Sequence, residues 1–140
     1  MTKEQLTSLA KEAMKNAYSP YSGYCVGAAL LCEDGSVYTG CNVENAGYSA
    51  TNCAERTAFF KAVSEGKREF VSIAVCGGKE GVIENAFPPC GVCRQVMREF
   101  CRDDFEIHLV TKEGIQSYTL GQLLPVSFSP DTLLKDGSEK

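Results

Sequence analysis

Two short cysteine motifs in separate parts of the chain constrain this sequence more than any other feature. Cys53-x-Glu55 stands at the expected start of one helix, and Cys90-x-x-Cys93 stands at the expected start of another. Residues three apart at the start of a helix lie on one side of it, so Cys90 and Cys93 can bind the same ion. A fold that brings the two helix starts together adds Cys53 as a third sulfur ligand.

Three thiolates around one metal ion leave a coordination position open, which is typical of catalytic zinc. Zinc lowers the pKa of water toward roughly 7, and that water then needs a proton carrier beside it. Glu55 lies two residues from Cys53. We therefore expect it to be the general acid and base rather than a ligand. The N-terminal dipoles of both helices favour the thiolate forms of the cysteines.

Two arginines lie close to these cysteines in the sequence. Three thiolates on one Zn²⁺ leave a net negative charge, and Arg56 is expected to offset it by donating hydrogen bonds to a ligand sulfur. Arg94, directly after Cys93, is a weaker candidate for the same role. The alternative for each arginine is a solvated charge on a helix surface.

The C-x-x-C pair alone has other interpretations. It occurs as a redox pair, although that function favours a βαβ context near the N-terminus and needs no third cysteine. It also occurs as half of a structural zinc site, which usually has two such pairs. The sequence contains no second pair.

The composition of the chain argues against nucleic acids and membranes as partners. The chain has 140 residues, a net charge of −4 and a pI of about 5.0. It lacks the basic stripe that nucleic-acid backbones require, so a nucleotide-like ligand should be a small molecule. No apolar run approaches the roughly 18 residues of a membrane span, and the amphipathic N-terminus lacks the apolar core of a secretory signal. We expect a cytoplasmic protein.

The remaining cysteines are expected to be reduced and to pack as small apolar residues. The cytosol keeps thiols reduced, and free cysteine is among the most buried residue types. This prediction covers five positions: Cys25, Cys32, Cys41, Cys76 and Cys101.

Hydrophobic periodicity predicts alternating helices and strands in one domain, residues 1–140. Helices are expected at 2–17, 53–65, 90–101 and 120–125, and strands at 25–32, 37–43, 70–77, 105–111 and 115–119. The first two strands form a hairpin around Asp34-Gly35, and the tail is expected to be mostly irregular. Strands separated by one helix imply parallel neighbours, so the hairpin makes an α/β fold with a mixed sheet.

Five segments together resemble the small homotetrameric, zinc-dependent cytidine deaminases of the cytidine and deoxycytidylate deaminase family, over nearly the whole chain. They are PYSGYCVGAAL, GCNVENAGYS, NCAERTA, PPCGVCRQV and LLPVSF. The resemblance implies a three-layer α/β/α fold around a mixed five-stranded sheet. It also implies one Zn²⁺ per subunit on Cys53, Cys90 and Cys93. The family's first ligand is His or Cys, and the single histidine, His108, lies away from these motifs and is expected to be structural.

The same resemblance implies an activity in pyrimidine salvage. Cytidine, and also 2′-deoxycytidine, would be hydrolysed to uridine or deoxyuridine and ammonia. Glu55 would move protons from water to ring N3 and to the departing amine. Asn42 and Glu44, two apart at a strand end, leave the same face, and their amide and carboxylate suit ribose hydroxyls. The resemblance assigns both to the ribose.

Four further residues are assigned to the substrate by resemblance alone. Ala54 belongs to the Cys-Ala-Glu motif. Tyr24 stands where the family usually has Phe, and it would stack on the base with an added hydroxyl that needs a partner. Tyr48 and Phe128 would reach the substrate pocket of a neighbouring subunit, so that the active sites of a homotetramer are shared between subunits.

Other functions are compatible with part of this pattern. Another small-molecule aminohydrolase of the same fold, such as a blasticidin S deaminase, would share the cysteines and Glu55, although Asn42 and Glu44 favour a nucleoside. A deaminase acting on RNA or DNA would need a polynucleotide channel, which a short acidic chain does not favour. A non-enzymatic zinc module would need four protein ligands and would tolerate a change at Glu55.

Overall fold

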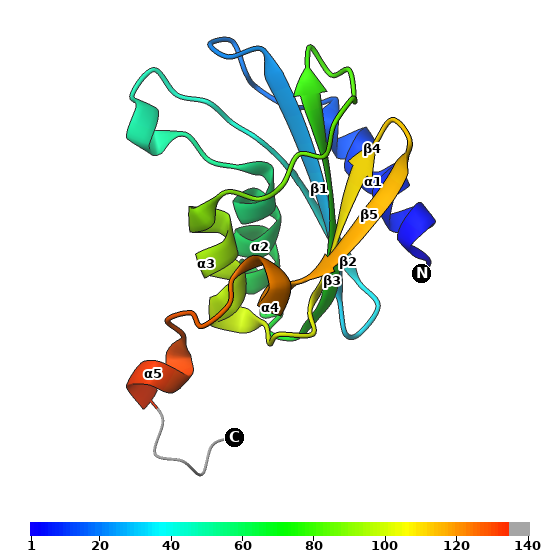
Figure 1. Cartoon of the computed structure of the whole chain (residues 1–140). Coiled ribbons are helices and arrows are strands. Elements are labelled where there is room, and N and C mark those ends of the chain that lie inside the picture. The colour runs from blue at the N-terminus through cyan, green and yellow to red at the C-terminus, as the bar shows by residue number, and fades with distance from the viewer. Residues whose placement is uncertain (135–140) are drawn as a thin grey trace.

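A mixed five-stranded sheet forms the centre of the computed structural model, which describes residues 1–134 (Figure 1). The strand order is β2-β1-β3-β4-β5. β3 pairs with β4 in parallel, and the other neighbouring strands are antiparallel. The strands are β1 (Tyr24–Cys32), β2 (Val37–Cys41), β3 (Phe70–Lys79), β4 (Glu106–Thr111) and β5 (Gly114–Thr119).

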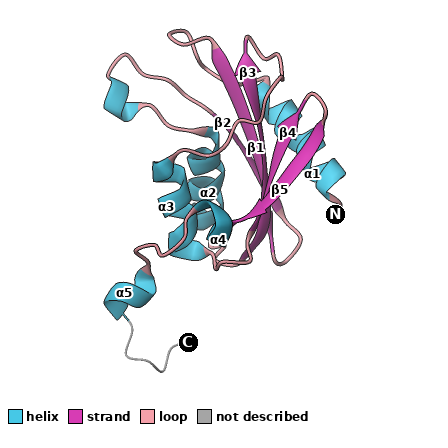
Figure 2. Cartoon of the chain, viewed as in Figure 1, coloured by secondary structure: helices cyan, strands magenta, loops and turns pink. Residues whose placement is uncertain are grey.

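Helices cover both faces of this sheet (Figure 2). One face carries α1 (Lys3–Met14), and the other carries α2 (Ala54–Ser64), α3 (Gly91–Phe100) and the short α4 (Leu120–Leu123). A 3-10 turn, η1 (Tyr48–Ala50), and a last short helix, α5 (Pro130–Leu134), complete the described chain. The predicted three-layer α/β/α fold with a mixed five-stranded sheet is confirmed.

The two layers of core follow from the alternation of side chains along the central strands. In β1, Ala28 and Leu30 pack toward α2 and α3, whereas Ala29 between them packs toward α1. Phe59 of α2 is the largest fully buried side chain, and it lies in the core layer between the sheet and the helices α2 and α3. Because β1 and β3 are buried on both faces, their sequences read as continuous apolar runs.

One predicted neighbour relationship is wrong. β2 and β3 are joined through α2 and were expected to lie side by side in parallel. They do run in the same direction, but β1 lies between them and pairs antiparallel with both. The hairpin folds β2 outward to the sheet edge, so the crossover from β2 passes β1 before it reaches β3.

Element ends differ from the sequence prediction by a few residues. α1 ends at Met14 rather than 17, although residues 15–17 continue in tighter turns through i→i−3 hydrogen bonds. β2 ends at Cys41, because Val43 leaves the hairpin and bridges Tyr18 and Asn52. The tail expected to be irregular contains α5, and its residues 135–140 lie outside the described part.

Three of the five cysteines expected in the core are buried: Cys32, Cys76 and Cys101. Burial raises the pKa of Cys76 to about 11 and that of Cys101 to about 12, which makes both thiols unreactive near neutral pH. Cys25 and Cys41 are only half-buried, because Cys25 lies near the beginning of β1 and Cys41 is the last residue of β2. Within residues 1–134, no helix is long and apolar enough to cross a lipid bilayer.

Candidate active site

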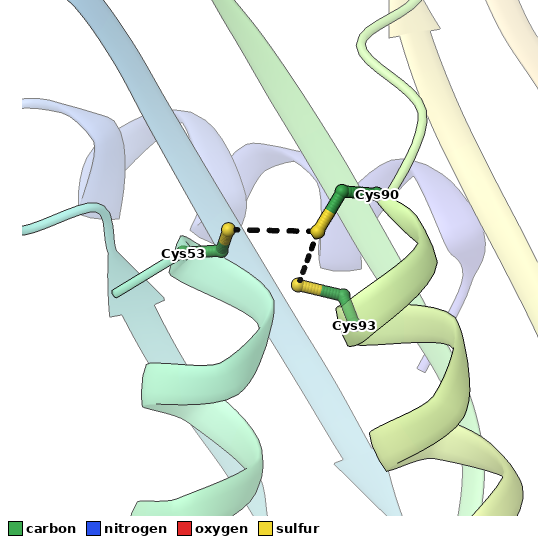
Figure 3. Close-up of side chains that lie close together, drawn as sticks. All are labelled: Cys53, Cys90 and Cys93. Atoms are coloured by element: carbon green, nitrogen blue, oxygen red, sulfur yellow. Dashed lines mark hydrogen bonds between the residues drawn. The ribbon is translucent and has the colours of Figure 1, made fainter. Parts of the chain in front are cut away.

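Three cysteine sulfurs meet where the N-termini of α2 and α3 lie side by side (Figure 3). The Sγ atoms of Cys53 and Cys90 are 3.9 Å apart, and those of Cys90 and Cys93 are 3.6 Å apart. All three lie within 4.8 Å of one another. The fold therefore brings together the three residues that the sequence predicted as metal ligands.

The backbone places two of these cysteines at helix N-caps. Cys53 precedes α2 and Cys90 precedes α3, and both have extended backbone angles, so their side chains project from the helix starts. α2 can approach the sheet closely because Gly40 of β2 has no side chain. A Cβ at this position would lie 2.5 Å from the carbonyl oxygen of Ala54. The first turn of α2 thus rests directly on β2.

The cluster fits a zinc ion. Zinc holds thiolate sulfurs at about 2.3 Å, so two sulfurs of a tetrahedral site lie about 3.8 Å apart. The separations of 3.6 and 3.9 Å agree with that spacing. Within the described chain, these three are the only grouped Cys, His, Asp or Glu side chains that could hold a metal, which leaves a fourth position without a protein ligand.

Arg56 donates a hydrogen bond from Nη2 to the Sγ of Cys53 over 3.2 Å, and it also interacts with Cys93. Hydrogen bonds from Cys93 and then from Arg56 lower the pKa of Cys53 to about 5. The pKa of Cys93 is raised in turn, because it donates to Cys53 and is buried. The predicted position of Arg56 beside a ligand sulfur agrees with this geometry.

Arg94 has a different role from the one considered for it. Its Nε donates to the carbonyl of Pro89 over 2.8 Å, and its Nη1 donates to that of Leu123 over 2.7 Å. The guanidinium thus joins the start of α3 to the end of α4. Residue 94 follows Cys93 by about 100° of helical turn, so its side chain leaves α3 in a different direction from that of Cys93.

Glu55 is nearly fully buried beside this cluster, with 4% of its surface exposed. Burial raises the pKa of its carboxyl to about 7. A carboxyl with a pKa near the working pH exchanges protons efficiently in both directions. Glu55 lies in the first turn of α2, and among the described residues it is not part of the group that could hold a metal. Its role as general acid and base stays a prediction.

Asn42 contacts the start of β1, and Glu44 contacts the turn that precedes β1. Asn42 accepts at Oδ1 from Val26 N–H over 2.9 Å and donates from Nδ2 to the carbonyl of Tyr24 over 2.8 Å. Glu44 accepts from the backbone N–H groups of Tyr21 and Ser22. Both side chains therefore contact the chain between residues 21 and 26, and their role in holding a sugar stays a prediction.

Three aromatic residues expected at the substrate are exposed. Tyr24 packs beside Phe87 at a ring-centroid distance of 5.9 Å, and Lys79 Nζ lies 5.2 Å from its ring centroid. Tyr48, on the 3-10 turn, is 85% exposed, and Phe128 is 58% exposed. The segment that contains the 3-10 turn η1 extends away from the sheet (Figure 1), whereas Phe128 lies between α4 and α5 on a segment that is hydrogen-bonded to α3.

Ala54 and His108 are buried. Ala54 is fully buried in the core, with its backbone as well as its side chain covered. His108 lies in β4, where its Nδ1 hydrogen-bonds to Ser117 Oγ over 2.7 Å. The sulfur cluster does not include His108.

The comparisons with known proteins agree with this site. Residues 1–109 match the family model described as the cytidine and deoxycytidylate deaminase zinc-binding region. The chain belongs to the cytidine and deoxycytidylate deaminase family. Cys53, Glu55, Cys90 and Cys93 all lie within the matched residues.

Relatives of similar length support the same assignment. A cytidine deaminase of Sporosarcina psychrophila is 51% identical over 95% of this chain and 96% of its own length. One from Halalkalibacterium halodurans is 48% identical over 95% of this chain and 98% of its own. The crystal structure of cytidine deaminase from Burkholderia pseudomallei matches with a TM-score of 0.84 and 46% identity, covering 91% of this chain and 100% of that one.

The sequence patterns did not identify the residues that hold Glu44 and the segment of Phe128 in place. Arg98 and Gln95, on the same helix as Cys93, hold the segment that carries Phe128. Arg98 Nε donates to Ser127 Oγ and Gln95 Nε2 to the carbonyl of Phe128, both over 2.8 Å. Ser22, which no sequence pattern singled out, contacts Glu44. The spacing of Gln95 and Arg98 on one face of α3 was the only available signal.

Proposed function

We propose that this protein hydrolyses cytidine, and also 2′-deoxycytidine, to uridine or deoxyuridine and ammonia. The observation that carries this proposal is the buried carboxyl of Glu55 beside three cysteine sulfurs with zinc-compatible spacing. Family membership and the cytidine deaminases aligned over nearly the whole chain support the choice of substrate. We also propose that the protein acts in pyrimidine salvage, in the cytoplasm.

Cys53, Cys90 and Cys93 would hold one Zn²⁺ per subunit. When bound, zinc supplies Lewis acidity that lowers the pKa of water toward roughly 7. The chain's own contribution is to keep the sulfurs as thiolates, through the hydrogen bond from Arg56 and the N-termini of α2 and α3.

Glu55 moves the protons. It takes a proton from the attacking water and delivers it to N3 of the pyrimidine. It then takes the proton of the new hydroxyl on C4 and delivers it to the departing amine, which leaves as ammonia while the C4 carbonyl forms. Its raised pKa suits both roles, because a carboxyl with a pKa of about 7 is neither too weak as a base nor too weak as an acid. Burial also excludes competing water from the carboxyl.

The sugar would be held by Asn42 and Glu44, and the base by Tyr24. Each polar atom of the Asn42 amide keeps one further hydrogen-bonding capacity after its contact with β1. The ring of Tyr24 offers an exposed face for stacking on the pyrimidine. The assignment of Ala54 to the substrate rests on family membership alone.

Tyr48 and Phe128 would complete the substrate pocket of a neighbouring subunit in a homotetramer. Large aromatic side chains that are exposed favour contact with another molecule. Light scattering combined with an activity assay tests this proposal. A fully active monomer at the assay concentration would contradict it.

The direct test of the function is ammonia release by the purified, zinc-loaded protein. Cytidine, 2′-deoxycytidine, free cytosine and blasticidin S are assayed in parallel. We expect rapid release from the two nucleosides and little from cytosine, which offers no sugar to Asn42 and Glu44. Release from blasticidin S alone would instead favour the alternative aminohydrolase.

A further inference from the structure

The carboxylate of Glu44 is held by the turn that precedes β1, and Ser22 makes most of this contact. Glu44 Oε1 accepts from Tyr21 N–H over 2.9 Å and from Ser22 N–H over 3.1 Å, while Oε2 accepts from Ser22 Oγ over 2.5 Å. Ser22 Oγ in turn accepts from Tyr24 N–H over 3.0 Å. One hydroxyl therefore links the side chain proposed for the sugar to the backbone of the residue proposed for the base.

The carboxylate of Glu44 has few acceptor sites left for a ligand. An ionised carboxylate has about four lone-pair sites, two on each oxygen. Both sites of Oε1 and one site of Oε2 in Glu44 are taken by Tyr21 and Ser22. A single acceptor site on Oε2 remains, so Glu44 can accept one sugar hydroxyl without giving up a contact it already has.

We propose that Ser22 is a positioning residue for the sugar: its hydroxyl orients Glu44 so that one Oε2 lone pair meets one ribose hydroxyl. This inference rests on the proposed function. The two backbone N–H groups bind only Oε1, so without the Ser22 hydroxyl the carboxylate is free to rotate about that contact. The hydrogen bond from Ser22 also lowers the pKa of Glu44, which keeps the acceptor ionised.

The test is steady-state kinetics on zinc-loaded Ser22→Ala, Ser22→Thr, Glu44→Ala and the double variant Ser22→Ala/Glu44→Ala. We expect Ser22→Ala to raise KM for cytidine about five- to tenfold with little change in kcat, because it removes one hydrogen bond to a charged group. Ser22→Thr retains the donor and should keep KM near the wild-type value. Zinc content should stay the same in all four variants.

The double variant separates positioning from a merely structural role. If Ser22 acts through Glu44, the change Ser22→Ala should have almost no further effect on KM once Glu44 is alanine. An equal effect in both backgrounds would show that Ser22 acts by another route and would overturn the proposal. So would an unchanged KM in Ser22→Ala, or a KM in Ser22→Thr raised as much as in Ser22→Ala.

Failure of the proposed function gives a different result. A wild-type protein that releases no ammonia from cytidine refutes the function itself, and the positioning role with it. A wild-type protein that is active, with Ser22→Ala indistinguishable from it, refutes only the role of Ser22. Because the Ser22 side chain is exposed, the alanine variant should fold.

Discussion

The guanidinium of Arg56 lies one helical turn from Cys53 and donates to its sulfur from Nη2 over 3.2 Å. Within residues 1–134, the buried Nε of the same side chain has no hydrogen-bond partner. An unpaired buried N–H is costly, so we expect Arg56 to offset the charge of the thiolates rather than to stabilise the fold.

Replacing Arg56 should therefore lower activity more than stability. We expect Arg56→Gln to reduce kcat/KM about 10- to 100-fold, the usual effect of losing a partner of a metal ligand. Assays of ammonia release and measurement of bound zinc check this. Arg102→Gln is the matched control, because Arg102 is exposed and is expected to leave both quantities unchanged. Equal activity of the two variants would remove Arg56 from the site's chemistry.

Glu55→Gln should retain zinc and lose nearly all turnover. The amide has the shape of the carboxyl but cannot take up a proton, so the rate should fall by about 10²–10⁴-fold or more. The measurement is kcat on protein with confirmed zinc content, with Glu113→Gln as a control at an exposed position. Near wild-type turnover in the zinc-replete variant would refute Glu55 as the proton carrier.

Gly40→Ala should destabilise the protein and loosen the sulfur cluster. The added Cβ would lie 2.5 Å from Ala54 O and 2.6 Å from Ala58 N, so α2 must move away from β2. Overpacking of this kind costs about 1–3 kcal/mol. Urea unfolding and zinc content measure the effect. Gly91→Ala makes the same chemical change where the added atom meets no neighbour within 4 Å, and it should not destabilise the fold.

His108 should make the protein sensitive to mild acid. Burial lowers the pKa of His108, against the opposing effect of the nearby carboxylates Glu106 and Glu4. The unfolded state then binds the proton more tightly than the folded state. The contribution to stability is therefore complete above the ordinary histidine pKa of about 6.5 and is lost as pH falls below it.

A comparison with His108→Gln isolates this effect. The free energy of unfolding of the wild-type protein should fall relative to that of the variant between about pH 7.5 and pH 5.5, since carboxylates titrate alike in both proteins. Urea unfolding at several pH values in this range provides the measurement. Parallel pH dependences of the two proteins would contradict the prediction.

Local patterns predicted most of the elements and the metal ligands. The apolar spacing of Leu6 and Ala10 identified α1, and the Asp34-Gly35 turn identified the β1–β2 hairpin. The order of the strands in the sheet could not be predicted from local patterns. Nothing near β2 or β3 in the sequence indicates that β1 separates them, because strand order depends on pairing between segments far apart in the chain.

The sequence by itself determined the chemistry that is possible: three sulfurs in two helix-start motifs, a carboxyl two residues from one of them, and an amide and a carboxylate after a strand. Spacing within one helix or strand acts over a few residues and can be read directly. Only the tertiary structure decided that the starts of α2 and α3 meet, that Glu55 is buried and that Ser22 holds Glu44. Sulfur separations, desolvation and the partner of a carboxylate are set by atoms from distant segments, which no local pattern specifies.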